Sequence, residues 1–361
     1  MESFFRHLNL LELDGYCFER FLIGGEAASL AIFKRGIGHV LLKEPVPERV
    51  AVKFLIAPRR ERELETFRRE AETLLRIHRY GQSPTIVKAL CNVRSLDGLP
   101  VHYFFMDYVD GVSLKELFAK DPLPWEAGKA LDLLKRITAA LIPAAANAEV
   151  HRDLHPGNIM IAGPVTELTH LLIADDPGIR ILDFGVGRNW VTDQRDDWQE
   201  DRFRHPGAVS SWSPELLSDP SVVDSKHDVW ALGNLFYRMV TGEFAFYADH
   251  FKGYFDRVQS GAYDVELLEG QPFHVKRLIA SMFELSPRKR ISLGGLLKIT
   301  TDICDSGLVA WLEHHPALAE LYFLVEGNIW TCPLCSATNN PTNDGRCRAC
   351  GRYAENFLPP F

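Results

Sequence analysis

The feature that most constrains this chain is a polar loop between two apolar segments, which runs from His151 to Asn158 and reads His-Arg-Asp-Leu-His-Pro-Gly-Asn. Asp153 and Asn158 lie five positions apart, so one short loop can direct a carboxylate at a hydroxyl proton and an amide oxygen at a metal ion. A second carboxylate, Asp183, follows a strand-like apolar run. Two carboxylates and an amide suit Mg²⁺ and phosphate, because this hard cation takes oxygen ligands.

These residues resemble two motifs of the protein kinase superfamily in its eukaryotic-like form. The loop from His151 to Asn158 matches the catalytic loop H-R-D-x-x-x-x-N, and Asp183-Phe184-Gly185 matches the metal-binding D-F-G. The resemblance runs from about residue 16 to about residue 300. It implies an α+β fold with two lobes, a β-rich N-lobe and a helical C-lobe, and it implies ATP and Mg²⁺ as cofactors. Asp153 would accept the hydroxyl proton, and Asn158 and Asp183 would hold Mg²⁺.

The N-terminal part offers the segments that such a kinase uses to bind phosphates. Tyr16 to Phe33 alternates like two strands around Gly24 and Gly25, which would cover the phosphates although the match to the family's glycine loop is loose. The apolar strand around Lys53 resembles V-A-I-K, so this lysine would pair with the α- and β-phosphates. Glu70, in a helix-prone segment, would pair with Lys53. Glu72 is a rival that lies about 200° round an ideal helix.

A β-prone run from Val101 to Met106 leads into the segment that would be the hinge between the lobes. By resemblance Met106 is the gatekeeper, and the backbone of Asp107 and Val109 would meet the adenine. Trp125 to Asn147 then reads as a long helix that leads to the catalytic loop. Residues 163 to 178 lengthen the connection between Asn158 and Asp183 and are expected to form an insertion at the surface.

Three motifs downstream fit the C-lobe. Ser213-Pro214-Glu215 resembles the A-P-E that closes the activation segment, and Asp228 stands where the helix-F aspartate braces the catalytic loop. Arg290 matches a late arginine that would pair with Glu215, because a buried carboxylate and guanidinium make structural sense as a pair. Arg152 could receive a regulatory phosphate, for which the candidate acceptors are Thr192, Ser210 and Ser211.

Two positions depart from the serine/threonine kinase pattern. His155 stands where Lys is expected, and Ala208 stands where Thr is expected. The loop also resembles that of small-molecule kinases of the aminoglycoside and choline type, whereas Arg152, the D-F-G tripeptide and the Ser-Pro-Glu motif favour a protein kinase. We predict transfer of the γ-phosphate of Mg-ATP to Ser/Thr hydroxyls of proteins. A small-molecule kinase and a pseudokinase scaffold are the alternatives.

Four cysteines near the C-terminus form two C-x-x-C pairs with eleven residues between them, Cys332 with Cys335 and Cys347 with Cys350. Four thiolates at this spacing can close a tetrahedron around Zn²⁺. Trp330 resembles the tryptophan of Ran-binding-type zinc fingers, a family that binds single-stranded RNA or ubiquitin. A plain zinc ribbon that docks proteins, or that caps the kinase, is the other interpretation.

The predicted domains are a lead-in (1–15), a kinase domain (16–300, with N-lobe 16–106, hinge 107–111 and C-lobe 112–300), a helical linker (301–327), a four-cysteine zinc finger (328–353) and a tail (354–361). A formal net charge of −8 argues against a general polyanion binder, so double-stranded DNA is not an expected partner. No apolar run reaches the roughly 18 residues that a membrane span needs. We therefore expect a cytoplasmic protein without a membrane partner.

Overall fold

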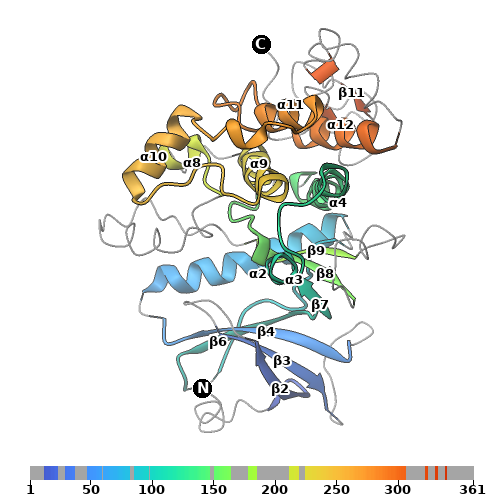
Figure 1. The fold of residues 1–361 in the computed structure, drawn as a ribbon. Helices are drawn as coiled ribbons and strands as arrows, with labels where there is room; N and C mark the ends of the chain where they lie inside the picture. Colours follow the sequence, from blue (N-terminus) through green and yellow to red (C-terminus); the bar gives the residue numbers. More distant parts are fainter. Residues whose placement is uncertain are drawn as a thin grey trace. The chain divides into compact units, whose positions relative to one another are not determined.

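The computed structural model describes residues 12–22, 29–36, 47–58, 60–81, 85–96, 98–146, 150–163, 178–184, 211–218, 224–305, 322–323, 330–331 and 338–339 (Figure 1). The chain divides into two compact units, Met1–Asp110 and Gly111–Phe361. The first unit is built on a β-sheet, and the second is mostly helical.

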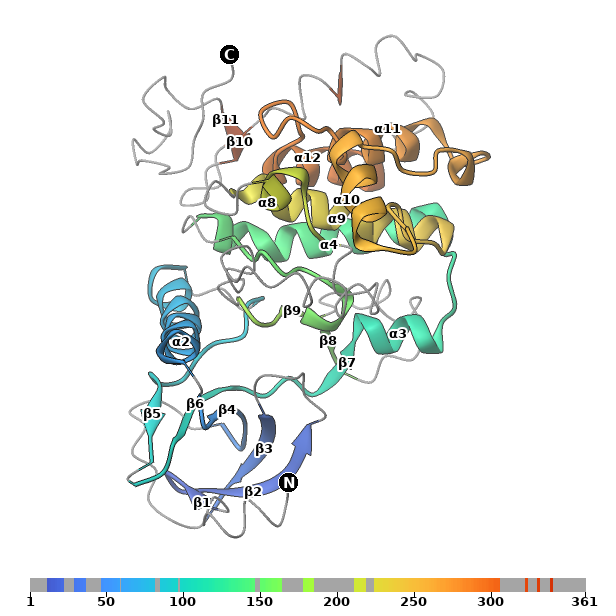
Figure 2. The same cartoon turned by 90° about the vertical axis from the view of Figure 1, so that its left-hand side faces the viewer.

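The first unit contains a curled antiparallel sheet, which Figure 2 shows from the side. Its strand order is β1-β2-β3-β4-β6-β5. The strands are β1 (Glu12–Leu13), β2 (Tyr16–Leu22), β3 (Ser29–Arg35), β4 (Arg49–Ile56), β5 (Arg94–Ser95) and β6 (Val101–Asp107). β4 lies at the centre and pairs with β3 on one side and β6 on the other.

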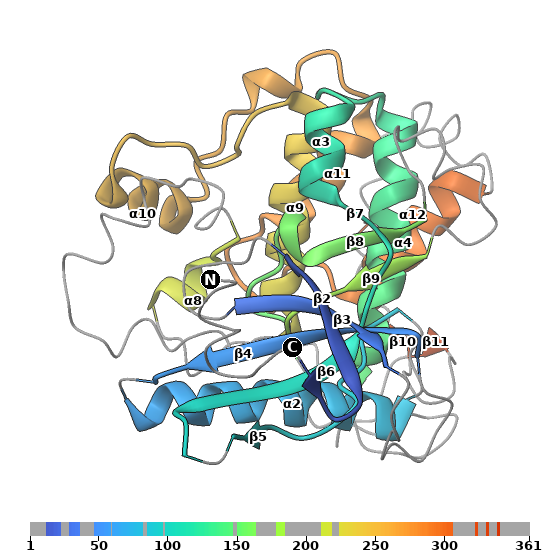
Figure 3. The same ribbon diagram turned by 90° about the horizontal axis from the view of Figure 1, so that it is seen from below.

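The alternation of β4 decides which side chains face the core. Val50, Val52 and Phe54 are fully buried in one hydrophobic cluster, as the period of two in a strand predicts for β-branched and aromatic residues. Lys53 therefore points to the other face, where it lies opposite Phe104 of β6. The ring of Phe104 contacts Phe67 of helix α2 (Glu61–Gly81), with 5.0 Å between ring centroids. Helix α2 thus covers the sheet face that carries Lys53 (Figure 3).

The second unit is arranged around helix α9 (Ser225–Thr241), whose residues from His227 to Val240 are almost all buried. α9 packs against α4 (Ala127–Ala146), α11 (Phe273–Met282) and α12 (Leu293–Asp305). The described part of this unit also contains α3 (Leu114–Lys120), α8 (Pro214–Ser218), α10 (Phe251–Ser260) and the 3-10 turn η4 (Glu266–Leu268). The side chain of Asp224 caps the start of α9, and Gly242, with φ of 84°, ends it.

A small sheet in the second unit positions the catalytic loop. The strands β7 (Gly111–Ser113), β8 (Ile159–Ala162) and β9 (Ile179–Ile181) pair antiparallel in that order, and the 3-10 turn η1 (Pro156–Asn158) leads into β8. A Cβ at Gly111 would lie 2.0 Å from the carbonyl oxygen of Ile161, so only glycine fits where β7 meets β8. The hairpin of β8 and β9 brings the segments before and after the insertion together.

The structure contains the strands and helices that the sequence predicts around the main motifs. β2 and β3 occupy the predicted strand pair, and α2, β6 and α4 occupy the predicted helix, strand and helix. α12 continues to Asp305, beyond residue 300, where the sequence places the end of the kinase domain. The exact domain limits therefore stay predictions. Among the helices of the described part of the chain, none is both long and apolar enough to cross a membrane.

Several predicted features fall outside the described residues. They are Gly24, Gly25, Gly185, most of the insertion (164–177), Thr192, Ala208, Ser210, Cys332, Cys335, Cys347 and Cys350. Short strands β10 (Trp330–Thr331) and β11 (Thr338–Asn339) pair antiparallel around the first cysteine pair.

Candidate active site

In the first unit, Lys53 and Glu70 form the ion pair that the sequence predicts. Lys53 Nζ donates to Glu70 Oε1 at 2.5 Å, and the Glu70 side chain is only 7% exposed. Glu72, the rival glutamate, is exposed. The helical phase of α2 thus selects Glu70. A buried carboxylate fixes the position of an ammonium group more firmly than an exposed one, because little water competes for either charge.

The end of β6, where the sequence places the hinge, is held by main-chain contacts. Met106 is buried and forms an isolated β-bridge with Ala89. The N–H of Asp107 donates to the carbonyl of Lys88 at 2.9 Å, and the N–H of Lys88 donates back to the Asp107 carboxylate at 3.3 Å. Val109, two residues further on, is half-buried. These contacts fix Met106 and Asp107, and the adenine contacts that the resemblance assigns to Asp107 and Val109 stay predictions.

In the second unit, the β8–β9 hairpin brings Asn158 next to the segment that carries Asp183. Ile159 pairs with Ile181, and the N–H of Leu182 donates to the carbonyl of Asn158 at 2.9 Å. The side-chain Nδ2 of Asn158 donates to the carbonyl of Asp153 at 2.9 Å. This bond leaves Oδ1 as the acceptor end of the amide. The end of the β8–β9 hairpin therefore places the amide oxygen of Asn158 near the backbone of Asp153 and of the segment that carries Asp183.

Asp228 of α9 braces the catalytic loop, as the resemblance implies. Its two carboxylate oxygens accept from the backbone N–H groups of His151, at 2.9 Å, and of Arg152, at 3.1 Å. Burial raises the pKa of Asp228 to about 7, and the two N–H donors act in the opposite direction by stabilising the charged form. Arg152 has φ of 65°, in the left-handed region that residues with a Cβ rarely adopt. The loop is thus held in a strained shape just before Asp153.

His151 connects the catalytic loop to the residues around Asp183. Its Nε2–H donates to the carbonyl of Leu182 at 2.7 Å, and its ring lies against Phe184 with 4.8 Å between centroids. Nδ1 accepts from the N–H of Asp153 at 3.3 Å. Burial lowers the pKa of His151 to about 4, so the ring is neutral and can make both contacts. Asp183 itself adopts a left-handed backbone, with φ of 46°.

His155, which stands where the kinase pattern has Lys, is held in one orientation. Its Nδ1 accepts from the N–H of Gly157 at 3.0 Å, so the neutral ring carries its proton on Nε2. That nitrogen lies 3.8 Å from Oδ2 of Asp153. A Cβ on Gly157 would lie 2.8 Å from Cε1 of His155, so glycine is needed for this ring position.

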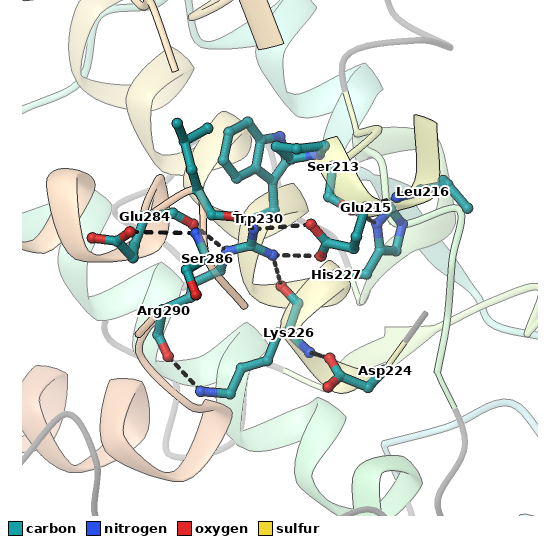
Figure 4. Close-up of polar contacts among 12 residues, drawn as sticks. Ser213, Glu215, Leu216, Asp224, Lys226, His227, Trp230, Glu284, Ser286 and Arg290 are labelled. Atoms are coloured by element: carbon teal, nitrogen blue, oxygen red, sulfur yellow. Dashed lines mark hydrogen bonds and ion pairs between the residues drawn. The ribbon is translucent and has the colours of Figure 1, made fainter. Parts of the chain in front are cut away.

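Arg290 and Glu215 form the second predicted pair (Figure 4). The guanidinium donates from Nη1 to Oε1 at 2.6 Å and from Nη2 to Oε2 at 3.0 Å. It also donates to the carbonyls of Glu284 and Lys226 and lies over the ring of Trp230. Burial acts to raise the pKa of Glu215, but the hydrogen bonds and charge of Arg290 outweigh it and hold that pKa below its usual value.

His227 belongs to this network but carries no motif of its own, and its contacts could not be found from the sequence. His227 lies between the hydroxyl of Ser213, at 2.8 Å from Nδ1, and the carbonyl of Arg152, at 3.2 Å from Nε2. Both partners lie more than ten positions away in the chain. The one available signal is a histidine directly before the bracing Asp228 and the apolar residues 229–232. Ser211, a candidate phosphate acceptor, is buried at 2% exposure.

The sequence predicts Asn158 and Asp183 as the ligands of Mg²⁺, and this donor pair suits a cation that keeps water and phosphate oxygens as its other ligands. Among the described residues, no group of three or more His, Cys, Asp or Glu side chains could enclose a metal ion by itself. This finding does not bear on the four C-terminal cysteines, which lie outside the described part.

The chain is similar to curated protein kinases from a yeast, a nematode and a bacterium. Serine/threonine-protein kinase cds1 of Schizosaccharomyces pombe is 29% identical over 248 residues, which are 66% of this chain and 48% of that protein. Calcium/calmodulin-dependent protein kinase type II of Caenorhabditis briggsae is 28% identical over 256 residues, 70% of this chain and 43% of that protein. Serine/threonine-protein kinase PknB of Mycobacterium leprae is 29% identical over 185 residues, which are 51% of this chain and 26% of that protein. The chain spans less than half the length of these relatives.

The model of the protein kinase domain family matches residues 39–301, which is well over half of the chain. This range contains Lys53, Glu70, Asp153, Asn158 and Asp183. Two of these relatives, cds1 and PknB, are serine/threonine-protein kinases by name. By sequence and by fold, the chain belongs to the protein kinase domain family.

Proposed function

We propose that this protein is a kinase that transfers the γ-phosphate of Mg-ATP to serine or threonine hydroxyls of proteins. The observation that carries the proposal is the end of the β8–β9 hairpin, where Asn158 is hydrogen-bonded to the backbone of Leu182 and Asp153. Asn158 and Asp183 offer oxygen donors at two strand ends, and Asp153 offers a carboxylate on the adjoining loop. This arrangement suits phosphoryl transfer, which depends on alignment and charge neutralisation.

The residues of the second unit have distinct proposed roles. Asp153 orients the acceptor hydroxyl and takes its proton, and Asn158 and Asp183 hold Mg²⁺ through their oxygens. When bound, Mg-ATP supplies the phosphoryl group and a cation that neutralises the charge developing on it. His151 and Asp228 keep the loop in the strained shape that aims Asp153. No residue of the chain needs to form a covalent bond with phosphate.

The residues of the first unit would bind the nucleotide. Lys53, which Glu70 holds in place, pairs with the α- and β-phosphates. Gly24 and Gly25, which lie outside the described residues, would let the backbone approach phosphate because glycine has no side chain. Met106, Asp107 and Val109 would line the adenine side. This part of the proposal rests on the order of the motifs, on the family match and on the Lys53–Glu70 pair.

The proposal is tested by incubating the purified protein with γ-labelled ATP and Mg²⁺, a generic protein acceptor and a mixture of small alcohols and aminoglycosides. Label on serine or threonine of protein is the expected result. Label on a small molecule alone would favour a small-molecule kinase, a class whose loop the stretch from Asp153 to Asn158 resembles. Transfer to neither acceptor would favour a scaffold without catalysis.

We further propose that Cys332, Cys335, Cys347 and Cys350 bind one Zn²⁺ as thiolates in a cytoplasmic, reducing environment, where four cysteines stay available for a metal. Support comes from their spacing and from the β10–β11 pair, which flanks the first cysteine pair. The module would serve to dock a protein, to bind single-stranded RNA or to stabilise the kinase.

Elemental analysis tests the zinc site. It should find one zinc per chain in wild type and none in the double variant Cys332→Ser with Cys347→Ser. Zinc retained in that double variant would contradict the assignment.

A further inference from the structure

His227 lies at a point where three segments of the second unit meet (Figure 4). Its side chain is fully buried, on helix α9. Nε2 faces the carbonyl of Arg152 and must donate its proton, because a carbonyl oxygen only accepts. Nδ1 of the neutral ring then accepts from the hydroxyl of Ser213. The ring therefore connects the catalytic loop to the residue that precedes helix α8.

The contact with Arg152 matters because that residue has a strained backbone. The N–H of Arg152 donates to Asp228, and its carbonyl accepts from His227. His227 and Asp228, which are neighbours in α9, thus hold the carbonyl and the N–H of Arg152, whose φ is 65°. A non-glycine residue keeps a left-handed conformation only where its surroundings impose it. Asp153 follows directly, so its direction depends on these two restraints.

The Nδ1 side of the His227 ring is held through Ser213. The Ser213 hydroxyl, which is fully buried, also lies 3.4 Å from the N–H of Leu216 in helix α8. Glu215, in the same helix, is fixed by the bidentate contact with Arg290. A rotation of His227 would therefore break contacts in two directions. The network that joins α8, α9 and Arg290 gives the ring one position.

We propose that His227 is a positioning residue for phosphoryl transfer, which fixes the backbone of Arg152 and thereby the direction of Asp153, with Ser213 holding the ring in the required tautomer. The inference rests on the proposed kinase function. A histidine that only fills space in the core would stabilise the fold without affecting the rate of transfer, and the two roles can be separated by substitution.

Two amide substitutions imitate different halves of the imidazole. The amide of His227→Gln reaches the position of Nε2 and can donate to Arg152, whereas the shorter His227→Asn reaches only the position of Nδ1. We expect kcat of His227→Asn to fall about tenfold or more, as small misplacements of a catalytic group do. KM for ATP should stay within about twofold, because the nucleotide contacts are unchanged. His227→Gln should recover kcat to within about threefold of wild type.

His274→Asn is the matched control, because His274 is also a buried histidine but lies on α11. It should lower thermal stability and leave kcat of the folded protein unchanged. Hydrogen exchange gives a second readout that needs no activity: the amides of His151 and Arg152 should exchange faster in His227→Asn than in His227→Gln. Equal kcat in wild type and His227→Asn, or a Gln variant as slow as the Asn variant, would overturn the proposal.

An inactive wild type would contradict the kinase function but leave the exchange comparison intact. In that case equal exchange of the loop amides in the two variants would overturn the positioning role as well. If His227→Asn fails to fold, Ser213→Ala serves instead, since it removes the donor to Nδ1 and leaves the ring in place. It should lower kcat without changing KM for ATP, and an unchanged kcat would contradict the proposal.

Discussion

The guanidinium of Arg290 and the carboxylate of Glu215 are 75 positions apart in the chain and meet in a bidentate pair, in which the arginine side chain is 0% exposed. The pair joins α8 to the segment between α11 and α12. Three carbonyl groups and the face of Trp230 complete the surroundings of the arginine. Its place in the core is therefore determined by polar partners as much as by packing.

Removal of one member of this pair should destabilise the protein strongly. Arg290→Ala removes a fully buried side chain and leaves the half-buried carboxylate of Glu215 without its counter-ion, and we expect the free energy of unfolding to fall by about 3–5 kcal/mol. Glu215→Ala should cost a similar amount, and the double variant should cost clearly less than the sum of the two. Urea denaturation of the three variants measures the coupling. Additive losses would show that the two side chains act independently.

The Lys53–Glu70 pair predicts a difference between two glutamates of the same helix. Glu70→Gln removes the charge that holds Lys53 and should lower kcat/KM for ATP about tenfold or more. Glu72→Gln makes the same chemical change two residues away on the exposed side of α2 and should change kcat/KM less than about twofold. Equal effects of the two substitutions would contradict the assignment of Glu70.

The buried histidine of α9 predicts a dependence of stability on pH. Burial lowers the pKa of His227 from 6.5 to about 4; the charge of Glu215 and the hydrogen bond to the backbone of Arg152 act against this shift, and the charges of Arg290 and Arg152 add to it. The unfolded chain therefore binds a proton between these values that the folded chain does not, so this contribution to stability is present above pH 6.5 and is lost as the pH falls toward 4. Between about pH 7 and about pH 5, wild type should lose about 2 kcal/mol more than His227→Gln.

Asp228, which lies beside His227, has a raised pKa and changes stability in the opposite direction over this range. Because both proteins contain Asp228, its effect cancels in the difference between wild type and His227→Gln. Urea denaturation at several pH values provides that difference. A difference that stays constant from neutral to acidic pH would show that His227 is not held neutral in the folded protein.

The pairs that carry a charge or a motif could be predicted from the sequence. Lys53 with Glu70, Glu215 with Arg290, and Asp228 with the catalytic loop all follow from the order of motifs, and all three contacts are present. Helical periodicity also separates Glu70 from Glu72, because only one of them can face the sheet. The strands on both sides of Lys53 follow from their β-branched and aromatic residues.

The bridge from Ser213 through His227 to Arg152 could not be predicted in this way. It depends on tertiary packing that brings together residues far apart in sequence, and a single buried histidine has no periodic signature. The left-handed backbone of Arg152 and Asp183 could not be predicted either, because arginine does not favour this conformation and aspartate adopts it only occasionally. Helix α12, which packs against α4, extends past residue 300 to Asp305, and no local stop signal marks residue 300.

The central claim is tested most directly by phosphate transfer from γ-labelled ATP to protein, measured for wild type, Asp153→Asn, Asp183→Asn and the control Asp256→Asn, whose side chain is exposed on α10. We predict that wild type and Asp256→Asn label serine or threonine at similar rates. The labelling rates of Asp153→Asn and Asp183→Asn should each be about a hundredfold or more lower than that of wild type. Undiminished labelling by Asp153→Asn and Asp183→Asn would contradict the account.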